Sequence, residues 1–188
     1  MNPEINFVFN AFAKLIMILR EALAPLAILL LAMTLAQTSQ AQISLAFGEL
    51  SWNRINTYLD NNYPQVKSIS TSELAALPTQ PVLLDVREEP EYLLSHIPGA
   101  KRWSESASLG LPDKNQTIVV YCSVGLRSAE VAKKLTDAGY SNVRNLRGSM
   151  FMWANENRPL QGQSNSKVHP YNKRWGQLLD VSKRALLP

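Results

Sequence analysis

The chain has 188 residues, of which 46% are hydrophobic and 18% are charged. These values indicate one folded domain with extensions and exclude a largely disordered protein. The net charge is +4, and the lysines and arginines are scattered along the chain. We therefore expect no nucleic-acid partner.

The first 41 residues predict an export signal. An uncharged run from Ala22 to Ala36 follows Lys14 and Arg20, and its length suits the core of a signal peptide better than a bilayer-spanning helix. Small residues at Ser39 and Ala41 predict cleavage after Ala41. The expected location is periplasmic or otherwise extracytoplasmic.

Two points about this segment stay open. Residues 1–16 make a long lead-in, so Met17 is a possible true start of the protein. The alternative to cleavage is a membrane anchor formed by residues 15–36, which would be the protein's only contact with a membrane.

Residues 42–66 are expected to form an N-terminal helical extension. Trp52, Ile55 and Leu59 recur at helical spacing and predict a packing helix over 48–60. Asn61 to Pro64 is a stop signal for that helix.

Residues 67–160 alternate between apolar β-branched runs and helical patterns. Strands are expected at 66–69, 81–86, 100–103, 117–121 and 143–146, and helices at 73–77, 90–94, 127–138 and 148–157. This alternation predicts an α/β fold with an open parallel sheet and helices on both faces. Residues 161–188 begin as a polar linker and continue as a tail whose aromatic and leucine side chains are expected to dock on the domain.

Cys122 is the only cysteine of the chain, and it follows the apolar run 117–121 directly. In an open parallel sheet, reactive groups lie beyond the carboxyl ends of the strands, where the next helix begins. There the helix N-terminus, Arg127 and the amides of the loop Ser123-Val124-Gly125-Leu126 favour a thiolate. Cys122 is therefore the candidate nucleophile, although a lone cysteine is often a buried and inert one.

Five ordered motifs resemble the single-domain rhodanese family of sulfurtransferases. They are Asp85-Val-Arg87-Glu88, Glu91-Tyr92, His96-Ile-Pro-Gly-Ala100, Tyr121-Cys122-Ser-Val-Gly125-Leu-Arg127-Ser128 and Gly148-Ser-Met-Phe-Met-Trp153. The resemblance covers about residues 67–160 and implies a five-stranded parallel sheet. It also implies that Cys122 carries a persulfide.

The implied reaction moves a sulfane sulfur from thiosulfate, or from a related persulfide donor, to a thiol or cyanide. Ser123, Val124, Gly125, Leu126 and Arg127 would bind the small sulfur oxyanion. One cysteine and two histidines offer no metal cluster, so no metal and no cofactor are expected.

The loop from Cys122 to Arg127 has the length that the family uses for sulfur transfer, whereas related phosphatases carry one residue more. A phosphatase is therefore disfavoured. The alternative from another class is a non-catalytic rhodanese-like module that binds a sulfur carrier or a protein partner. A role in sulfide detoxification with persulfidic donors is a further possibility.

Other polar and aromatic residues are expected to have structural roles. Asp85 and Arg87 are possible site-orienting residues, but residues at strand ends more often tie loops together. His96 is expected to stabilise its turn, and Trp103 and Trp153 to lie in the core or at its rim. Ser149 stands where the family often has glycine, and we expect it to affect packing without touching the loop of Cys122.

Overall fold

The structure is a computed structural model that describes residues 49–104 and 113–187. The chain divides into two units, and the described residues all belong to the second, Glu49–Pro188. The expected export signal, residues 1–41, lies outside the described residues. Within the described ranges, no helix combines the length and the apolar character needed to cross a membrane.

The five expected strands form one parallel sheet in the order β1-β5-β4-β2-β3. The strands are β1 (Lys67–Ile69), β2 (Val82–Asp85), β3 (Lys101–Arg102), β4 (Ile118–Tyr121) and β5 (Val143–Leu146). Because β4 lies in the middle of the sheet, all four of its residues are buried, as its continuous apolar sequence predicts. The predicted five-stranded α/β architecture is confirmed.

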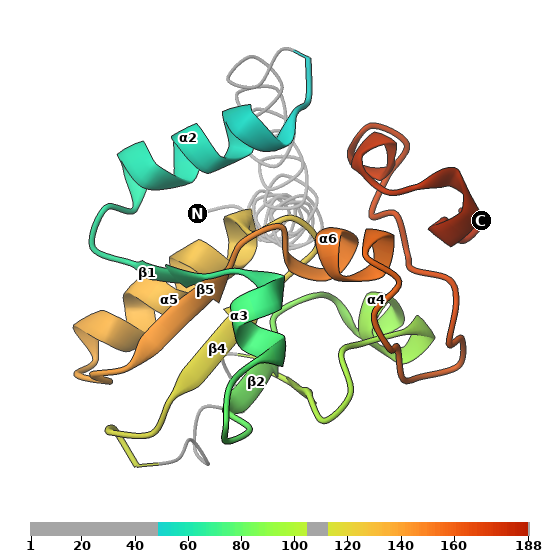
Figure 1. Cartoon of the computed structure of the whole chain (residues 1–188). Coiled ribbons are helices and arrows are strands. Elements are labelled where there is room, and N and C mark those ends of the chain that lie inside the picture. Colours follow the sequence, from blue (N-terminus) through green and yellow to red (C-terminus); the bar gives the residue numbers. More distant parts are fainter. Residues whose placement is uncertain (1–48, 105–112, 188) are drawn as a thin grey trace, which may run out of the picture. The chain divides into compact units, whose positions relative to one another are not determined.

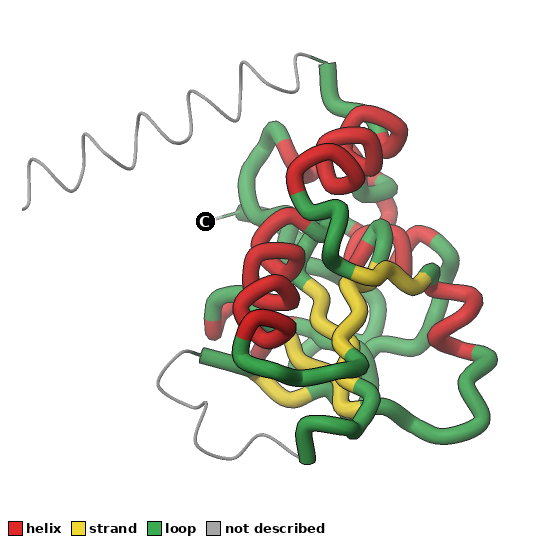
Figure 2. Tube along the Cα trace, turned by 90° about the vertical axis from the view of Figure 1, so that its left-hand side faces the viewer, coloured by secondary structure: helices red, strands yellow, loops and turns green. Residues whose placement is uncertain are grey.

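Helices cover both faces of this sheet (Figures 1 and 2). They are α2 (Trp52–Asn62), α3 (Thr71–Ala75), α4 (Glu89–Leu94), α5 (Leu126–Asp137) and α6 (Ser149–Asn155). Helix α5 packs on β4 and β5 and also contacts α2, whereas α3 contacts α6. The two helix layers arise because consecutive side chains of a strand point to opposite faces of the sheet.

Leu83 and Leu84 of β2 illustrate this alternation. Leu84 belongs to the core beneath α5, while Leu83 lines a groove beside α3 and α6. The buried side chains of the core beneath α5 are Leu84, Ile118, Val120, Val131, Ala132, Leu135 and Val143.

Helix α3 begins two residues earlier than the sequence pattern suggested. The Ser70 side chain accepts the Glu73 N–H, and the Glu73 carboxylate accepts the Ser70 N–H. This capping box makes Ser70 the N-cap, so the helix starts at Thr71 and not at Glu73. The expected start was wrong because it took Glu73 as the first residue rather than the third.

The C-terminal segment 161–187 contacts the domain at several points. Gln161 exchanges two backbone hydrogen bonds with His96, and Gln163 donates to the carbonyl of Leu93. Further along, the side chain of Asn155 in α6 bonds the backbone of Leu178 and Asp180. The stretch 161–166, expected as a linker, is therefore held against α4, and Val168, Trp175 and Leu179 are buried farther along.

We predict that α2 contributes substantially to stability. Ile55 is completely buried, and α2 contacts α5. Ile55→Ala is expected to lower the free energy of unfolding by about 2–5 kcal/mol, measured by urea denaturation. Thr57→Ala, an exposed change on the same helix, is the control and is expected to stay within about 0.5 kcal/mol of the wild type. Equal stabilities for the two variants would contradict the prediction.

Candidate active site

Cys122 lies directly after β4 and before α5, at the carboxyl edge of the sheet. Gly125 forms the N-cap of α5 with a φ of 111°. A side chain at Gly125 would be strained in this conformation, and its Cβ would lie 3.3 Å from Leu59 Cδ1. The glycine thus allows the chain to turn sharply from the strand into the helix.

The turn wraps the backbone around the sulfur. The Gly125 N–H points at Cys122 Sγ, with an N–S distance of 3.1 Å. Burial by itself would raise the pKa of Cys122, which is only 1% exposed. The charge of Arg127 and hydrogen bonds from Ser128 and Gly125 lower it, and the net shift of the Cys122 pKa is downward. The site therefore favours the thiolate.

Arg127 is held by Glu91 of α4. Its two terminal nitrogens each lie 2.9 Å from a different Glu91 oxygen, and Nη2 also donates to Ser123 Oγ at 3.0 Å. Ser123 Oγ in turn donates to Glu91 at 2.9 Å. The Tyr171 ring covers the guanidinium group, and the distance from Arg127 Cζ to the ring centre is 4.8 Å. Arg127 is thus fixed beside the thiol by groups from α4 and the C-terminal segment.

Glu91 is charged in this network. Its burial acts to raise its pKa, but the hydrogen bonds and charge of Arg127 lower it, and the net shift of the Glu91 pKa is downward. Sequence reasoning placed Glu91 in a motif without giving it a role. The helix α4 that carries it lies far from Cys122 in sequence, and only the fold brings the two together.

The loop residues proposed to bind substrate lie around Cys122 but differ in exposure. Ser123, Val124 and Gly125 are buried, whereas Leu126 and Arg127 are partly exposed. The carbonyls of Cys122 and Ser123 accept the N–H groups of Met150 and Phe151 in α6. The site is therefore attached to α6 as well as to α5.

Three polar residues that the sequence reasoning left without a site role support this loop. Asn145 donates to the carbonyl of Gly125 at 3.0 Å and accepts from the Ser128 hydroxyl at 2.7 Å. Ser149 Oγ accepts the Cys122 N–H at 3.3 Å and donates to the carbonyl of Leu146 at 2.9 Å. The expectation that Ser149 does not touch the loop was wrong, because its hydroxyl bridges the loop to β5. The sequence did carry one signal of this contact, because Ser149 is a polar residue at a position where the pattern predicts burial.

Asp85 and Arg87 form a completely buried ion pair, with a shortest distance of 2.6 Å. Arg87 Nη2 also donates to the carbonyl of Ser95 at 2.6 Å. The pair ties the end of β2 to the turn before β3, and among the described residues no hydrogen bond or ion pair joins it to Cys122.

His96 stacks on Tyr92 with ring centres 4.1 Å apart, and its Nδ1 lies 2.9 Å from the Tyr92 carbonyl oxygen. His96 therefore holds its own turn. His169 Nδ1 accepts the N–H of Tyr171. This hydrogen bond lies within the C-terminal segment. In the described ranges, 49–104 and 113–187, no group of three or more His, Cys, Asp or Glu side chains is arranged to hold a metal ion.

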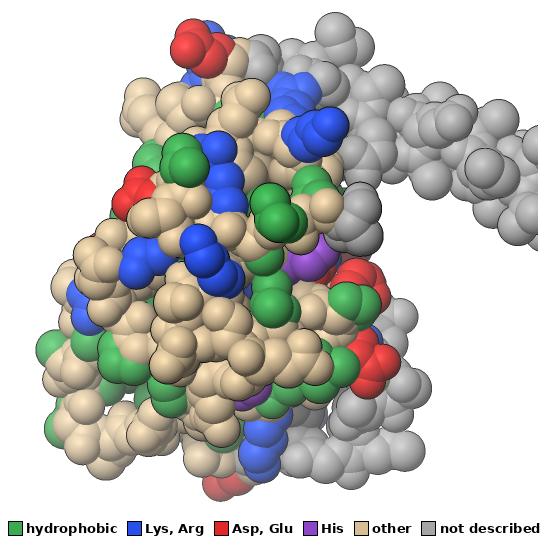
Figure 3. All heavy atoms as spheres, turned by 90° about the vertical axis from the view of Figure 1, so that its right-hand side faces the viewer, with side chains coloured by type: hydrophobic (Ala, Val, Ile, Leu, Met, Phe, Trp, Pro, Cys, Tyr) green, Lys and Arg blue, Asp and Glu red, His purple; other side chains and the backbone are tan. Residues whose placement is uncertain are grey.

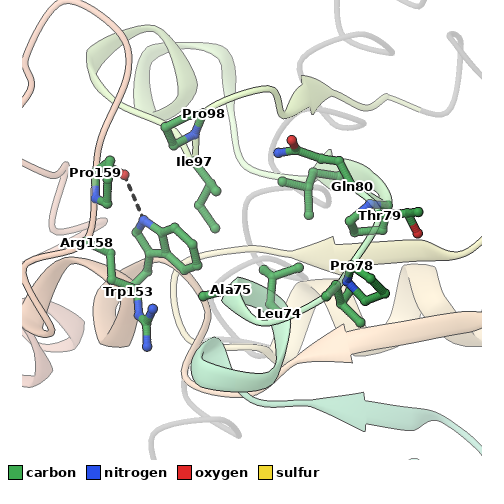
Figure 4. Close-up of a pocket in the computed structure, with 13 residues that line it drawn as sticks. Leu74, Ala75, Pro78, Thr79, Gln80, Ile97, Pro98, Trp153, Arg158 and Pro159 are labelled. Carbon is green, nitrogen blue, oxygen red and sulfur yellow. Dashed lines mark hydrogen bonds between the residues drawn. The ribbon is translucent and has the colours of Figure 1, made fainter.

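A groove of about 430 Å³ lies on the α3 and α6 side of the sheet. Figure 4 shows it between Trp153, whose Nε1 donates to the carbonyl of Pro159 at 2.8 Å, and the loop carrying Pro78 and Gln80. Its described lining contains neither Cys122 nor a carboxylate. This groove is separate from the thiol site. Trp153, one of its lining residues, is 7% exposed and belongs to the buried core, as expected.

Comparisons with known proteins identify relatives of the domain. Residues 70–156 match the family described as rhodanese-like domain. The chain is 36% identical to the thiosulfate sulfurtransferase PspE of Escherichia coli over 70 residues, which cover 35% of this chain and 67% of that protein. It is 31% identical to a sulfurtransferase of Allochromatium vinosum over 105 residues, which cover 51% of this chain and 92% of that protein.

Further matches include one relative of which the chain covers only a small part, and one solved structure. The chain is 34% identical over 82 residues to the probable adenylyltransferase/sulfurtransferase MoeZ of Mycobacterium tuberculosis, but spans only 21% of its length. Among solved structures, a rhodanese-like domain protein from Staphylococcus aureus is 33% identical, with a TM-score of 0.45, and the match covers 53% of this chain and 100% of that one.

We predict that Arg127 stabilises the Cys122 thiolate. Arg127→Gln removes the cation whose charge lowers the Cys122 pKa, so the Cys122 pKa is expected to rise. Because Cys122 is the only cysteine, thiolate absorbance followed against pH reports its titration alone. Arg144→Gln, on β5, is the control and should leave the midpoint of the Cys122 titration unchanged. Identical midpoints for wild type and Arg127→Gln would contradict the prediction, with circular dichroism checking that each variant is folded.

Proposed function

Since the chain belongs to the rhodanese-like domain family, we propose that it is a sulfurtransferase that carries a sulfane sulfur as a persulfide on Cys122. The supporting observation is the site itself. A thiol of lowered pKa lies beside Arg127 with a backbone amide on its sulfur. Such a thiol is a nucleophile at neutral pH.

In the first half-reaction, the Cys122 thiolate attacks the outer sulfur of thiosulfate. A bond forms between Cys122 Sγ and that sulfur, the sulfur–sulfur bond of thiosulfate breaks, and sulfite leaves with the bonding electron pair. The Gly125 amide, which points at Sγ, and the Arg127 charge stabilise the thiolate that attacks, and the Arg127 charge also offsets the negative charge of the incoming anion.

In the second half-reaction, a nucleophilic acceptor such as cyanide or a thiolate attacks the terminal sulfur of the persulfide. The new bond joins the acceptor to that sulfur, and Cys122 leaves as a thiolate. Charge balances in both steps without an outside oxidant or reductant. The scheme requires no metal or organic cofactor and is expected to show ping-pong kinetics.

The charge of the C-terminal segment supports an anionic donor. Residues 161–187 hold five lysines and arginines and one acidic residue, Asp180. Figure 3 shows lysine and arginine side chains on the face that this segment occupies in Figure 1. Tyr171 of the same segment covers Arg127. A basic surface beside the site raises the local concentration of anions and their rate of arrival.

We predict that transfer from thiosulfate to cyanide depends on Cys122. The purified chain should form thiocyanate and gain the mass of one sulfur atom when thiosulfate is supplied alone. Cys122→Ser, which preserves size and removes the thiol, should abolish both signals. The control Ser166→Ala changes an exposed residue of the C-terminal segment and should retain both.

Folded protein that yields neither thiocyanate nor a persulfide from thiosulfate would contradict this function. If it gained sulfur from glutathione persulfide instead, the persulfidic-donor role would replace thiosulfate. If it gained none from either donor, the non-catalytic binding module would remain.

We also propose that the protein is exported and processed after Ala41. The support is the uncharged run Ala22 to Ala36 with basic residues before it and small residues at Ser39 and Ala41. N-terminal sequencing of protein from the periplasmic fraction is expected to begin at Gln42. A chain that stays in the membrane fraction with residues 15–36 intact would instead support the anchor.

A further inference from the structure

Tyr171 belongs to the C-terminal segment and lies outside residues 70–156, which match the rhodanese-like family. Its ring nevertheless lies on the guanidinium group of Arg127, with 4.8 Å between Arg127 Cζ and the ring centre. Neither half-reaction described above gives Tyr171 a role. The fold thus brings an aromatic side chain from a distant part of the sequence to the cation that acts on Cys122.

The backbone of Tyr171 adopts an unfavourable conformation. Its φ is 63°, in the left-handed region that residues with bulky side chains rarely adopt. Such a conformation costs free energy, so it persists only where the surrounding contacts impose it. Residues held in this way are concentrated at functional sites, and this one places its ring on a residue of the candidate active site.

Contacts on both sides of Tyr171 impose this conformation. Its N–H donates to His169 Nδ1 at 3.1 Å, and the Asn172 N–H donates to the carbonyl of Pro170 at 2.8 Å. Pro170 is buried, and Gly176 packs so closely on it that a Cβ at Gly176 would lie 2.8 Å from Pro170 Cβ. The turn that carries the Tyr171 ring is therefore held in place.

Arg127 is bonded along its edge and covered on a face. Its two terminal nitrogens donate to Glu91 and Ser123, and the N–H groups of a guanidinium point outward in its own plane. These bonds leave the faces of the guanidinium open, and the Tyr171 ring covers one of them at a distance typical of a cation–π contact.

The ring also limits the access of water to Arg127. The Arg127 side chain is 32% exposed even with Tyr171 in place. Without the ring, the covered face would be open to water, whose high dielectric constant weakens the interaction between charges. The contact with Tyr171 therefore strengthens the effect of the Arg127 charge on the Cys122 sulfur.

We propose that Tyr171 is a positioning residue of the active site, which acts on Cys122 through Arg127. Its ring keeps the positive charge of Arg127 in place beside the thiolate and the incoming donor anion. For sulfur transfer the proposal rests on the function proposed above, whereas its effect on the Cys122 thiol is measurable without any transfer.

Alkylation of Cys122 by iodoacetamide, followed against pH without a sulfur donor, tests the proposal. Tyr171→Asn removes the ring, and asparagine tolerates a positive φ better than most residues, so the turn should be kept. Because Cys122 is the only cysteine, the alkylation rate reports this thiol alone. In Tyr171→Asn the midpoint of the pH profile is expected to shift upward, with alkylation about threefold slower below the midpoint.

Two further variants show whether the ring is responsible. Tyr171→Phe keeps the ring and should recover the wild-type profile. Tyr140→Asn is the matched control, because Tyr140 also lies on a cation, with Lys114 Nζ 5.8 Å from its ring centre, but beyond the C-terminal end of α5. This control should leave the midpoint of the alkylation profile unchanged.

The kinetics of transfer from thiosulfate to cyanide separate the proposal from the function on which it rests. Tyr171→Asn should lower the kcat/KM for thiosulfate about threefold, and Tyr171→Phe should restore it. If the wild type forms no Cys122-dependent thiocyanate while the alkylation midpoint moves in Tyr171→Asn, the proposed function fails and the role of Tyr171 stands.

Three results would overturn the proposal. An unchanged alkylation midpoint in Tyr171→Asn, with circular dichroism showing a folded protein, would leave the ring a structural role only. Faster alkylation of this variant at every pH would make Tyr171 a barrier to access. An equal shift of the midpoint in Tyr140→Asn would show a general effect of removing an aromatic side chain.

Discussion

The ion pair between Arg127 and Glu91 is the interaction on which the candidate site depends. It joins the first turn of α5 to α4 and includes the Ser123 hydroxyl, so it closes the loop of Cys122 from one side. Glu91 is buried, and its charge is stable there because two nitrogens of Arg127 bond it. Breaking the pair would leave a buried carboxylate without compensation and would release the cation that favours the Cys122 thiolate.

Polar support for the loop extends beyond this pair. On the opposite side, Asn145 and Ser149 bind the Gly125 carbonyl and the Cys122 amide. The loop is therefore held from α4, β5 and α6 together. Preorganised donors and charges of this kind stabilise developing negative charge without having to rearrange during a reaction. The same rigidity explains how a nearly fully buried thiol can keep a lowered pKa against the effect of burial.

The sequence alone determined the architecture and the place of Cys122 in it. Apolar runs and turn signals are local, so they predicted the parallel sheet and placed Cys122 at the end of β4. The sequence did not reveal the contacts of Glu91 with Arg127 or the bridge made by Ser149, because these depend on residues from separate elements meeting at one edge of the sheet. Such contacts depend on the register of the strands and on the direction of each side chain, and both are properties of the tertiary structure.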